Sequence, residues 1–412
     1  MTPALLSRLA ARFGTPLYVY DLDAVEKRAT ELREAVPSRF EIAYAVKANP
    51  SLAILSLLRA RGFSADVASK GELSAVRRAG FAPSRILATG PAKSDLDLAA
   101  LVSTNVSQIH AEGEWELDAL EALAKRRKRP VRVGLRLNPP WGIAEKRTII
   151  GGPGAKKFGL DLVSARRVLA RRSRWPHLSI GGFQVFNASN VLDARLLVEN
   201  VERVLDLALS LARRFDVPLR AVDFGGGLGV PYAGGEKPLD LGLFGAGLER
   251  VAASSAGEPR LASTRLVFEP GRFLVAESGR YVTRVLGTKK SRGVTYVLVD
   301  GGVHHLLRPA LIGTPHRLEP IPRRASRRAK VVVAGPLCTS LDVLHPGARI
   351  VLPERGDLLA FENAGAYGFT ESMPLFLSHE WPAEVGVRQG RAALLRRAPT
   401  VRELLRAQRR AV

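Results

Sequence analysis

Between residues 42 and 271 the chain alternates short apolar runs with amphipathic segments of helical periodicity. Apolar runs bounded by turn residues predict buried strands, and regular alternation with helices predicts a parallel sheet. Eight such strands over the roughly 250 residues typical of the fold predict a (β/α)8 barrel. The predicted strands cover residues 42–48, 64–69, 86–90, 106–111, 131–138, 178–189, 221–227 and 265–271.

After residue 280 the pattern changes to short apolar runs separated by turn residues, with little helix between them. This texture is typical of an all-β domain. The apolar run at 17–21 predicts an additional strand that joins the same domain. We therefore predict an N-terminal segment, 1–25, that joins the β domain, a barrel over 26–280, and a C-terminal β domain over 281–412.

The formal net charge is +23, from 62 Lys and Arg residues against 39 Asp and Glu. Such a surplus fits a solvated basic surface, or attraction of an acidic partner. The basic residues are scattered, aromatic residues make up 6% of the chain, and no nucleic-acid-binding motif accompanies them, which disfavours nucleic acid as the partner. The densest basic clusters are 125–129, 323–330 and the C-terminal RELLRAQRR.

The number of cysteines and the hydropathy of the chain indicate where in the cell the protein is expected. Cys338 is the only cysteine of the chain, so no internal disulfide can form and a reducing cytoplasm is expected. No apolar run reaches the roughly 18 residues of a membrane span, and the first residues lack the apolar stretch of a signal peptide. We expect a cytoplasmic protein that binds neither membranes nor nucleic acid.

Polar side chains and glycines occupy the predicted ends of the barrel strands, where chemistry collects in this fold. A lysine that closes one apolar strand is usually a rim residue, and three consecutive glycines are often only a tight turn. Here such residues recur at most strand ends, which favours a functional site. The residues are Lys47, Asp66, Arg136, Ser189, Gly225, Gly226, Gly227, Glu269 and Arg272.

The loops after the last two predicted strands indicate a phosphate site. Three glycines allow backbone N–H groups to approach an anion, and Arg272 can bind phosphate in a bidentate manner. A phosphate site, a lysine at an apolar strand end and the carboxylate of Glu269 together favour pyridoxal phosphate. Its aldehyde needs a lysine such as Lys47, and its ring nitrogen needs a facing carboxylate.

Motifs along nearly the whole chain resemble the fold-type III pyridoxal-phosphate decarboxylases, of which diaminopimelate and ornithine decarboxylases are the familiar members. No single motif is specific, but their combination and order are. The motifs are YAVKANP (44–50), DVASKGEL (66–73), KFGL (157–160), DFGGGLG (223–229), EPGR (269–272), RPAL (308–311), GPLCTSLD (335–342) and NAGAYG (363–368).

The resemblance implies a homodimer with active sites shared between subunits. It implies that Lys47 binds the cofactor aldehyde and that Cys338 from the other subunit protonates the carbanion after carbon dioxide leaves. No metal ligands are implied. The implied cofactor-binding residues, besides Lys47, are Asp66, Arg136, Phe186, Ser189, Gly225, Gly226, Gly227, Glu269, Gly271, Arg272 and Tyr367; those for the substrate are Arg308, Ile312, Thr339 and Asp342.

Three departures from the family pattern bear on the substrate. Phe186 stands where a histidine stacks on the cofactor ring, and its phenyl face can still stack. Thr339 replaces the glutamate expected to hold a distal ammonium, and Ile312 replaces a tyrosine near the far end of the substrate. Arg308 is kept, which allows an anionic or carbonyl group there. These changes disfavour free diaminopimelate.

The sequence therefore predicts decarboxylation of a different amino acid, in a secondary pathway. Some relatives act on amino acids tethered to an acyl carrier protein. Because such carriers are acidic, the basic surface of this chain would attract one. The alternatives are a diaminopimelate decarboxylase of lysine biosynthesis, a racemase of the alanine racemase type, and a non-catalytic homologue. The GPLCTSLD motif speaks against a racemase, and retention of Lys47, Glu269 and Cys338 speaks against a non-catalytic protein.

Overall fold

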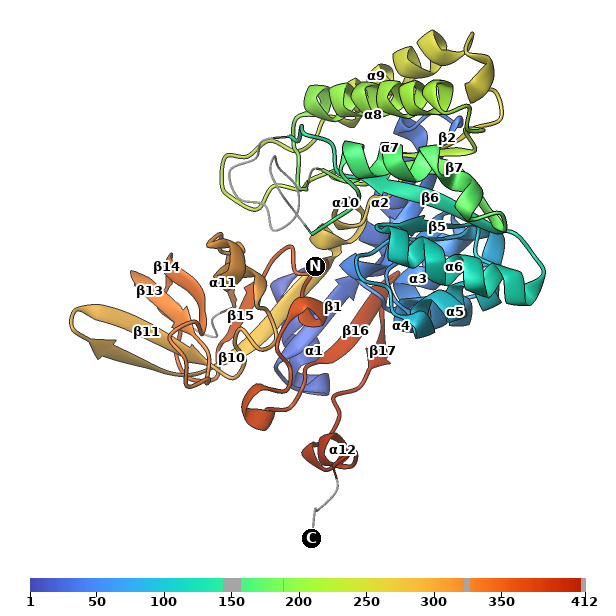
Figure 1. Ribbon diagram of the computed structural model, residues 1–412. Helices are drawn as coiled ribbons and strands as arrows, with labels where there is room; N and C mark the ends of the chain where they lie inside the picture. Colours follow the sequence, from blue (N-terminus) through green and yellow to red (C-terminus); the bar gives the residue numbers. More distant parts are fainter. Residues whose placement is uncertain (144–156, 188, 322–326, 409–412) are drawn as a thin grey trace. The chain divides into compact units, whose positions relative to one another are not determined.

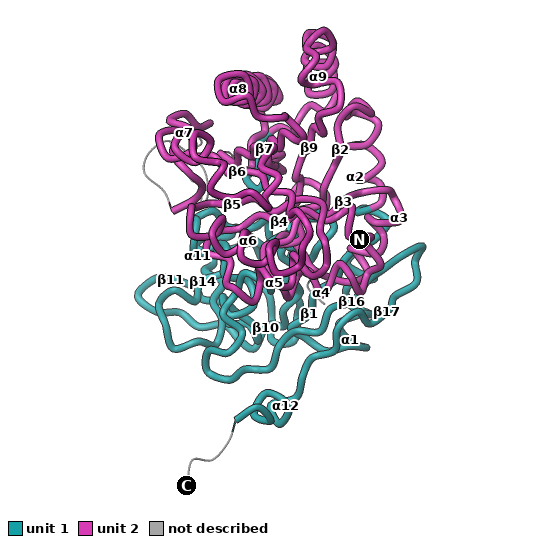
Figure 2. Tube along the Cα trace, turned by 45° about the vertical axis from the view of Figure 1, so that its right-hand side comes forward, with its two compact units in different colours: residues 1–25, 231–236, 275–412 teal, residues 26–230, 237–274 magenta. Residues whose placement is uncertain are grey.

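A computed structural model describes residues 1–143, 157–187, 189–321 and 327–408. The chain forms two compact units (Figure 2). The barrel unit comprises residues 26–230 and 237–274, and the β unit comprises residues 1–25, 231–236 and 275–412. Of the predicted basic cluster 323–330, residues 323–326 lie outside the described part of the chain.

The barrel unit contains a closed barrel of eight parallel strands, which confirms the predicted fold class. Each strand pairs in parallel with the next, and the last closes on the first through the register Phe40↔Leu266. The strands are β2 (Phe40–Ala45), β3 (Ser64–Val67), β4 (Ile86–Ala88), β5 (Gln108–Ala111), β6 (Val131–Leu137), β7 (Leu178–Val185), β8 (Ala221–Asp223) and β9 (Arg265–Phe268).

Helices lie on the outside of these strands (Figure 1). Several begin at a residue whose side chain accepts a backbone N–H, as Ser94 does before α5 and Asp240 before α9, which satisfies orphan donors of the first turn. The helices are α2 (Leu22–Ala35), α3 (Leu52–Ala60), α4 (Lys70–Arg78), α5 (Asp95–Thr104), α6 (Glu114–Arg127), α7 (Leu162–Ala170), α8 (Ala194–Arg214), α9 (Leu241–Ser255) and α10 (Arg272–Val275).

Several barrel strands end earlier than the sequence predicts. β2 stops at Ala45, and Lys47 lies in the 3-10 turn Val46–Ala48. β8 stops at Asp223 because Gly225 and Gly227 adopt φ values of 66° and 99°, which a strand does not allow. The predicted 178–189 and 265–271 likewise end at residues 185 and 268. The polar residues therefore lie in loops just beyond the strands.

The β unit is built around a nine-stranded sheet. β1 (Leu17–Asp21) pairs antiparallel with β10 and parallel with β16, so the two ends of the chain share one sheet. A core that includes Leu6, Leu17, Val282 and Val385 packs there. The other strands are β10 (Gly279–Ser291), β11 (Val294–Val299), β12 (Leu318–Ile321), β13 (Arg328–Ala334), β14 (Val343–Val351), β15 (Leu358–Phe361), β16 (Ala383–Arg388) and β17 (Arg391–Arg396).

Short helical elements complete the fold. In the described residues, no helix is both long and apolar enough to cross a bilayer. The α-helices of the β unit are α1 (Pro3–Phe13), α11 (Arg308–Ile312) and α12 (Val401–Leu405), and the remaining 3-10 turns are Pro83–Arg85, Arg172–Arg174, Pro259–Leu261, Ala276–Ser278, Phe369–Glu371 and Phe376–Ser378.

Candidate active site

Lys47 projects from the turn after β2 into the carboxyl end of the barrel. Its Nζ lies 3.1 Å from Oδ2 of Asp66, on the neighbouring strand β3, and 5.9 Å from the ring centroid of Phe186. Asp66 is fully buried within the strand, whereas Phe186 directly follows β7. Three strand ends thus bring together an amine, a carboxyl and an aromatic face.

The loop after β9 fixes the turn that carries Lys47. The N–H of Ala45 donates to the carbonyl of Pro270 at 3.1 Å. A Cβ on Gly271 would lie 2.9 Å from Cβ of Ala48, so a larger residue would push the two loops apart. The EPGR motif therefore holds the lysine turn in place, in addition to presenting its own side chains.

Glu269 is the central carboxylate of this site and is 2% exposed. Gln184 Nε2 donates to its Oε2 at 2.9 Å, and the Thr89 hydroxyl donates to its Oε1 at 3.2 Å. Burial works to raise the pKa of Glu269, but the charge of Lys47 and hydrogen bonds from Asp223 and Gln184 hold it below its usual value. Glu269 is therefore anionic at neutral pH.

Two further carboxyl groups lie buried beside Glu269. Burial and the charge of Glu269 raise the pKa of Asp66 to about 7, although Lys47 opposes this. The same two causes raise the pKa of Asp223 well above its usual value. Asp223 also accepts the N–H of Gly225 on Oδ1 at 2.8 Å. Asp223 is thus a neutral acid that links the glycine loop to Glu269, where the negative charge resides.

His110, at the carboxyl end of β5, is part of the same network. Its Nδ1 lies 2.8 Å from the Thr89 hydroxyl, and its Nε2 lies 2.7 Å from Nε2 of Gln108. Because the Thr89 hydroxyl donates to Glu269, Nδ1 of His110 carries the proton and Nε2 accepts from Gln108. Burial lowers the pKa of His110 to about 4, so the imidazole is neutral.

The glycine loop after β8 packs closely against its neighbours. A Cβ on Gly226 would lie 2.3 Å from the carbonyl oxygen of Glu269, and one on Gly225 would lie 2.8 Å from Cδ2 of Phe186. Arg272, which begins α10, is buried, and Ser189 is half-buried in the loop after β7. The predicted phosphate-binding residues thus belong to loops at the same end of the barrel.

A pocket opens among these residues. Oδ1 of Asp66 and Oε1 of Gln184 are buried and have no hydrogen-bond partner among the described residues. A lysine, an anionic carboxylate and an aromatic face around one pocket fit an aldehyde-bearing, protonated aromatic ring such as pyridoxal phosphate. The pocket lining includes Lys47, Thr89, Arg136, Phe158, Gln184, Phe186 and Glu269.

Arg136, on β6, forms the wall of the pocket together with the KFGL motif. Its guanidinium pairs with Glu112 at 2.6 Å and lies 4.9 Å from the ring centroid of Phe158. The other carboxylate oxygen of Glu112 accepts the N–H of Gly159 at 2.8 Å. Glu112 therefore connects Arg136 to the KFGL segment and fixes both.

The remaining predicted site residues lie in the β unit. Cys338 is exposed in the loop between β13 and β14, and Thr339 is half-buried beside it. Asp342 is buried, and its two carboxylate oxygens accept the N–H groups of Val303 and Leu337 at 2.8 and 2.7 Å. These contacts fix the loop that carries Cys338.

Arg308 is a buried cation at the start of α11. It lies 3.8 Å from Oε2 of Glu371 and over the rings of Tyr232 and Tyr367, with centroid distances of 5.6 and 5.8 Å. Ile312 ends the same short helix and is half-buried. The β unit thus presents Arg308 and Tyr367 as one cluster.

Comparison with known proteins identifies the family. The model of the family described as "Pyridoxal-dependent decarboxylase, pyridoxal binding domain" matches residues 22–276. The chain belongs to this family. As such, it is a pyridoxal-phosphate-dependent amino-acid decarboxylase.

Relatives match this decarboxylase over nearly its whole length. L-glutamyl-[BtrI acyl-carrier protein] decarboxylase of Niallia circulans is 33% identical and covers 98% of this chain and 96% of its own. Diaminopimelate decarboxylase of Aquifex aeolicus is 32% identical, covering 95% and 91%. The structure of diaminopimelate decarboxylase from Helicobacter pylori with L-lysine superposes with a TM-score of 0.88 at 30% identity, covering 97% and 98%.

The structure also adds site residues that the sequence reading missed. Thr89, His110, Gln184 and Asp223 surround Glu269. All four are polar residues inside predicted strands, and Asp223 directly precedes the glycine loop. A polar residue in an otherwise apolar barrel strand is the signal that could have found them, because a side chain there must find a polar partner.

We expect the cofactor of this decarboxylase to be attached to Lys47. Borohydride reduction followed by peptide mass spectrometry should place the added mass on the peptide with Lys47 and not on that with Lys93. Lys93 is the matched control, because it is also buried but its Nζ contacts Glu116 at 2.9 Å and the carbonyls of Gly90 and His110 at 2.8 Å. Label on Lys93, or none on cofactor-saturated protein, contradicts the assignment.

We expect Asp223→Asn to keep most of the activity. Asparagine is neutral, as Asp223 is, and can still accept from Gly225 and donate to Glu269. Asp223→Ala removes both contacts, so kcat/KM and cofactor affinity should each fall about tenfold or more. Steady-state kinetics and cofactor titration measure both. Equal losses in the two variants would show that Asp223 acts as an anion.

Proposed function

We propose that this decarboxylase acts on an amino acid without a free distal amino-acid head, preferably a glutamyl group tethered to an acidic acyl carrier protein. The observation that carries the proposal is the pair Thr339 and Ile312, together with the retained Arg308. Neither replacement side chain carries a negative charge. A distal ammonium would therefore lack its partner, at a cost of several kcal/mol if buried.

Two further observations support a carrier-bound substrate. The relative from Niallia circulans carries a name that specifies a glutamyl group on a carrier protein. The net charge of +23 would accelerate the encounter with an acidic carrier through long-range attraction. The other named relatives are diaminopimelate decarboxylases, which makes that activity the second candidate.

We assign each of the residues around the pocket a separate role in binding the cofactor. Pyridoxal phosphate, when bound, supplies an electron sink for the pair left on Cα as carbon dioxide leaves. Lys47 would bind its aldehyde, and Gly225–Gly227 and Arg272 would bind its phosphate. Glu269 would keep the ring nitrogen protonated, and Phe186 would offer an aromatic face to the ring.

The proton that replaces carbon dioxide would come from a second subunit. We propose a homodimer in which Cys338 of the partner subunit donates the proton to Cα. In each chain, Asp342 holds the loop that carries this thiol through the backbone N–H groups of Val303 and Leu337. Cys338 is exposed on that loop, as a thiol that serves a neighbouring subunit must be.

We expect glutamyl-carrier conjugates to be decarboxylated with a kcat/KM at least a hundredfold above that of diaminopimelate. The reason is that neither Thr339 nor Ile312 carries a negative charge that could pair with the distal ammonium of diaminopimelate. Initial rates of carbon dioxide release from diaminopimelate, ornithine, lysine and the conjugates, at low and high salt, make the comparison. Salt should lower only the rate with the carrier, because it screens the attraction between the two proteins.

Efficient turnover of free diaminopimelate that is insensitive to salt would contradict the proposed carrier-bound substrate. It would favour the alternative, a diaminopimelate decarboxylase of lysine biosynthesis. The double variant Thr339→Glu with Ile312→Tyr provides the matched control. It restores the family's residues, so it should raise activity on diaminopimelate and lower it on the conjugate.

We also expect subunit mixing to restore activity between two inactive variants. Lys47→Ala and Cys338→Ala should each be severely impaired alone. After random exchange about half of the dimers are mixed, and each mixed dimer has one intact site, so activity should reach about a quarter of wild type. No recovery, with exchange verified by mass spectrometry, would show that both residues act within one subunit.

A further inference from the structure

The amino-terminal mouth of the barrel, at the opposite end of the strands from Lys47, contains a second pocket. Its lining is rich in arginine and serine residues. Gln108, the first residue of β5, also lines it. Its lining also includes Ser107, Arg132, Ser179, Gly181, Arg220 and Arg265.

The strand ends hold two of these arginines in place. Arg132 on β6 donates from Nε to the carbonyl of Ser107 at 2.8 Å, and it lies opposite Ser179 of β7 in the sheet register. Arg220, just before β8, donates from Nη1 to the Ser179 hydroxyl. A Cβ on Gly181 would lie 3.1 Å from Nη1 of Arg220, so the glycine leaves room for this guanidinium.

The charges of these two arginines are not neutralised. Arg265 pairs with Glu41 at 2.7 Å. Across the described ranges of the chain, no carboxylate lies within ion-pair distance of Arg132 or Arg220. The pocket therefore has a surplus of two positive charges, fixed by backbone and hydroxyl contacts.

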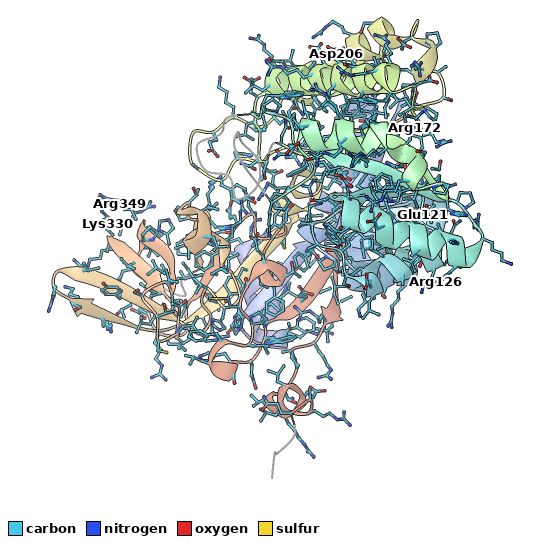
Figure 3. All side chains as sticks on the ribbon, in the orientation of Figure 1. Glu121, Arg126, Arg172, Asp206, Lys330 and Arg349 are labelled. Atoms are coloured by element: carbon cyan, nitrogen blue, oxygen red, sulfur yellow. The ribbon has the colours of Figure 1, made fainter. Side chains whose placement is uncertain are left out.

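An adjoining pocket extends the same positive surface. It shares Ser179 and Arg220 and adds Arg172, which follows α7 (Figure 3) and also has no ion-pair partner within the described part of the chain. Two nearby acidic side chains pair with other residues and not with Arg172. Glu121 binds His177, and Asp118 binds Arg174.

We propose that this amino-terminal mouth binds a small anion that carries two or more phosphate groups. Guanidinium groups bind phosphate oxygens in a bidentate manner, and serine hydroxyls can donate to the oxygens that remain. Arg132 on β6 and Arg220 before β8 lie on the two sides of β7, and Arg220 reaches the hydroxyl of Ser179 on that strand. Two linked phosphates can therefore each meet one guanidinium.

The test is calorimetric titration of inorganic pyrophosphate into the cofactor-loaded enzyme, with ionic strength held constant by chloride. One saturable site per chain is expected, with no change in the absorbance of the bound cofactor. Arg132→Gln and Arg220→Gln should each weaken binding about tenfold or more. Arg126→Gln on α6 (Figure 3) is the matched control, because it removes the same charge from an exposed arginine without an ion-pair partner in the described chain, and it should change nothing.

Inorganic phosphate serves as the second probe and should bind at least tenfold more weakly than pyrophosphate. Arg132→Lys keeps the charge and should retain part of the affinity, which separates loss of the site from loss of the fold. Four results would each overturn the proposal: absence of saturation, equal weakening by Arg126→Gln, equal affinity for the two probes, or release of the cofactor during titration.

Discussion

The negative charge of Glu269, buried where the barrel strands end, is the constraint on which the rest of the site depends. An isolated carboxylate in such a place would be costly. It persists because Lys47 supplies a nearby positive charge and because hydroxyl and amide groups donate to both of its oxygens. Burial and the negative charge of Glu269 raise the pKa of the neighbouring Asp223, so Asp223 is neutral. The barrel interior is thus arranged to keep one anion in one position.

Backbone contacts around Glu269 also keep this residue in one position. Its N–H donates to the carbonyl of Gly225 at 2.7 Å, and its own carbonyl leaves no space for a Cβ on Gly226. The next residue, Pro270, accepts the N–H of Ala45, close to Lys47. The group that would contact the ring nitrogen, the loop that would bind the phosphate and the turn that carries the lysine are therefore parts of one packed unit.

The sequence predicts the barrel well because alternating strands and helices leave a strong periodic signal. It overestimates the strands before the glycine and EPGR loops, because it assigns the loop residues 225–227 and 269–271 to the strands that precede them. It misses β12 and β17, which are short or partly exposed, and also the buried strand β16. The role of Asp342 depends on backbone groups from Val303 and Leu337, and no local pattern predicts which distant N–H groups a carboxylate will meet.

The pairing of β1 with both β10 and β16 has a consequence for synthesis on the ribosome. β1 is made first, but its partners begin at Gly279 and Ala383. At ordinary elongation rates the chain between β1 and β10 takes about 15–50 s to emerge. The barrel cannot close before β9 (Arg265–Phe268) is made at the end of that interval, and Leu17–Asp21 stays an unpaired apolar strand throughout it. An unpaired strand of this kind is a site of aggregation in a nascent chain, so the long separation of β1 from its partners favours slow, late completion of the β unit.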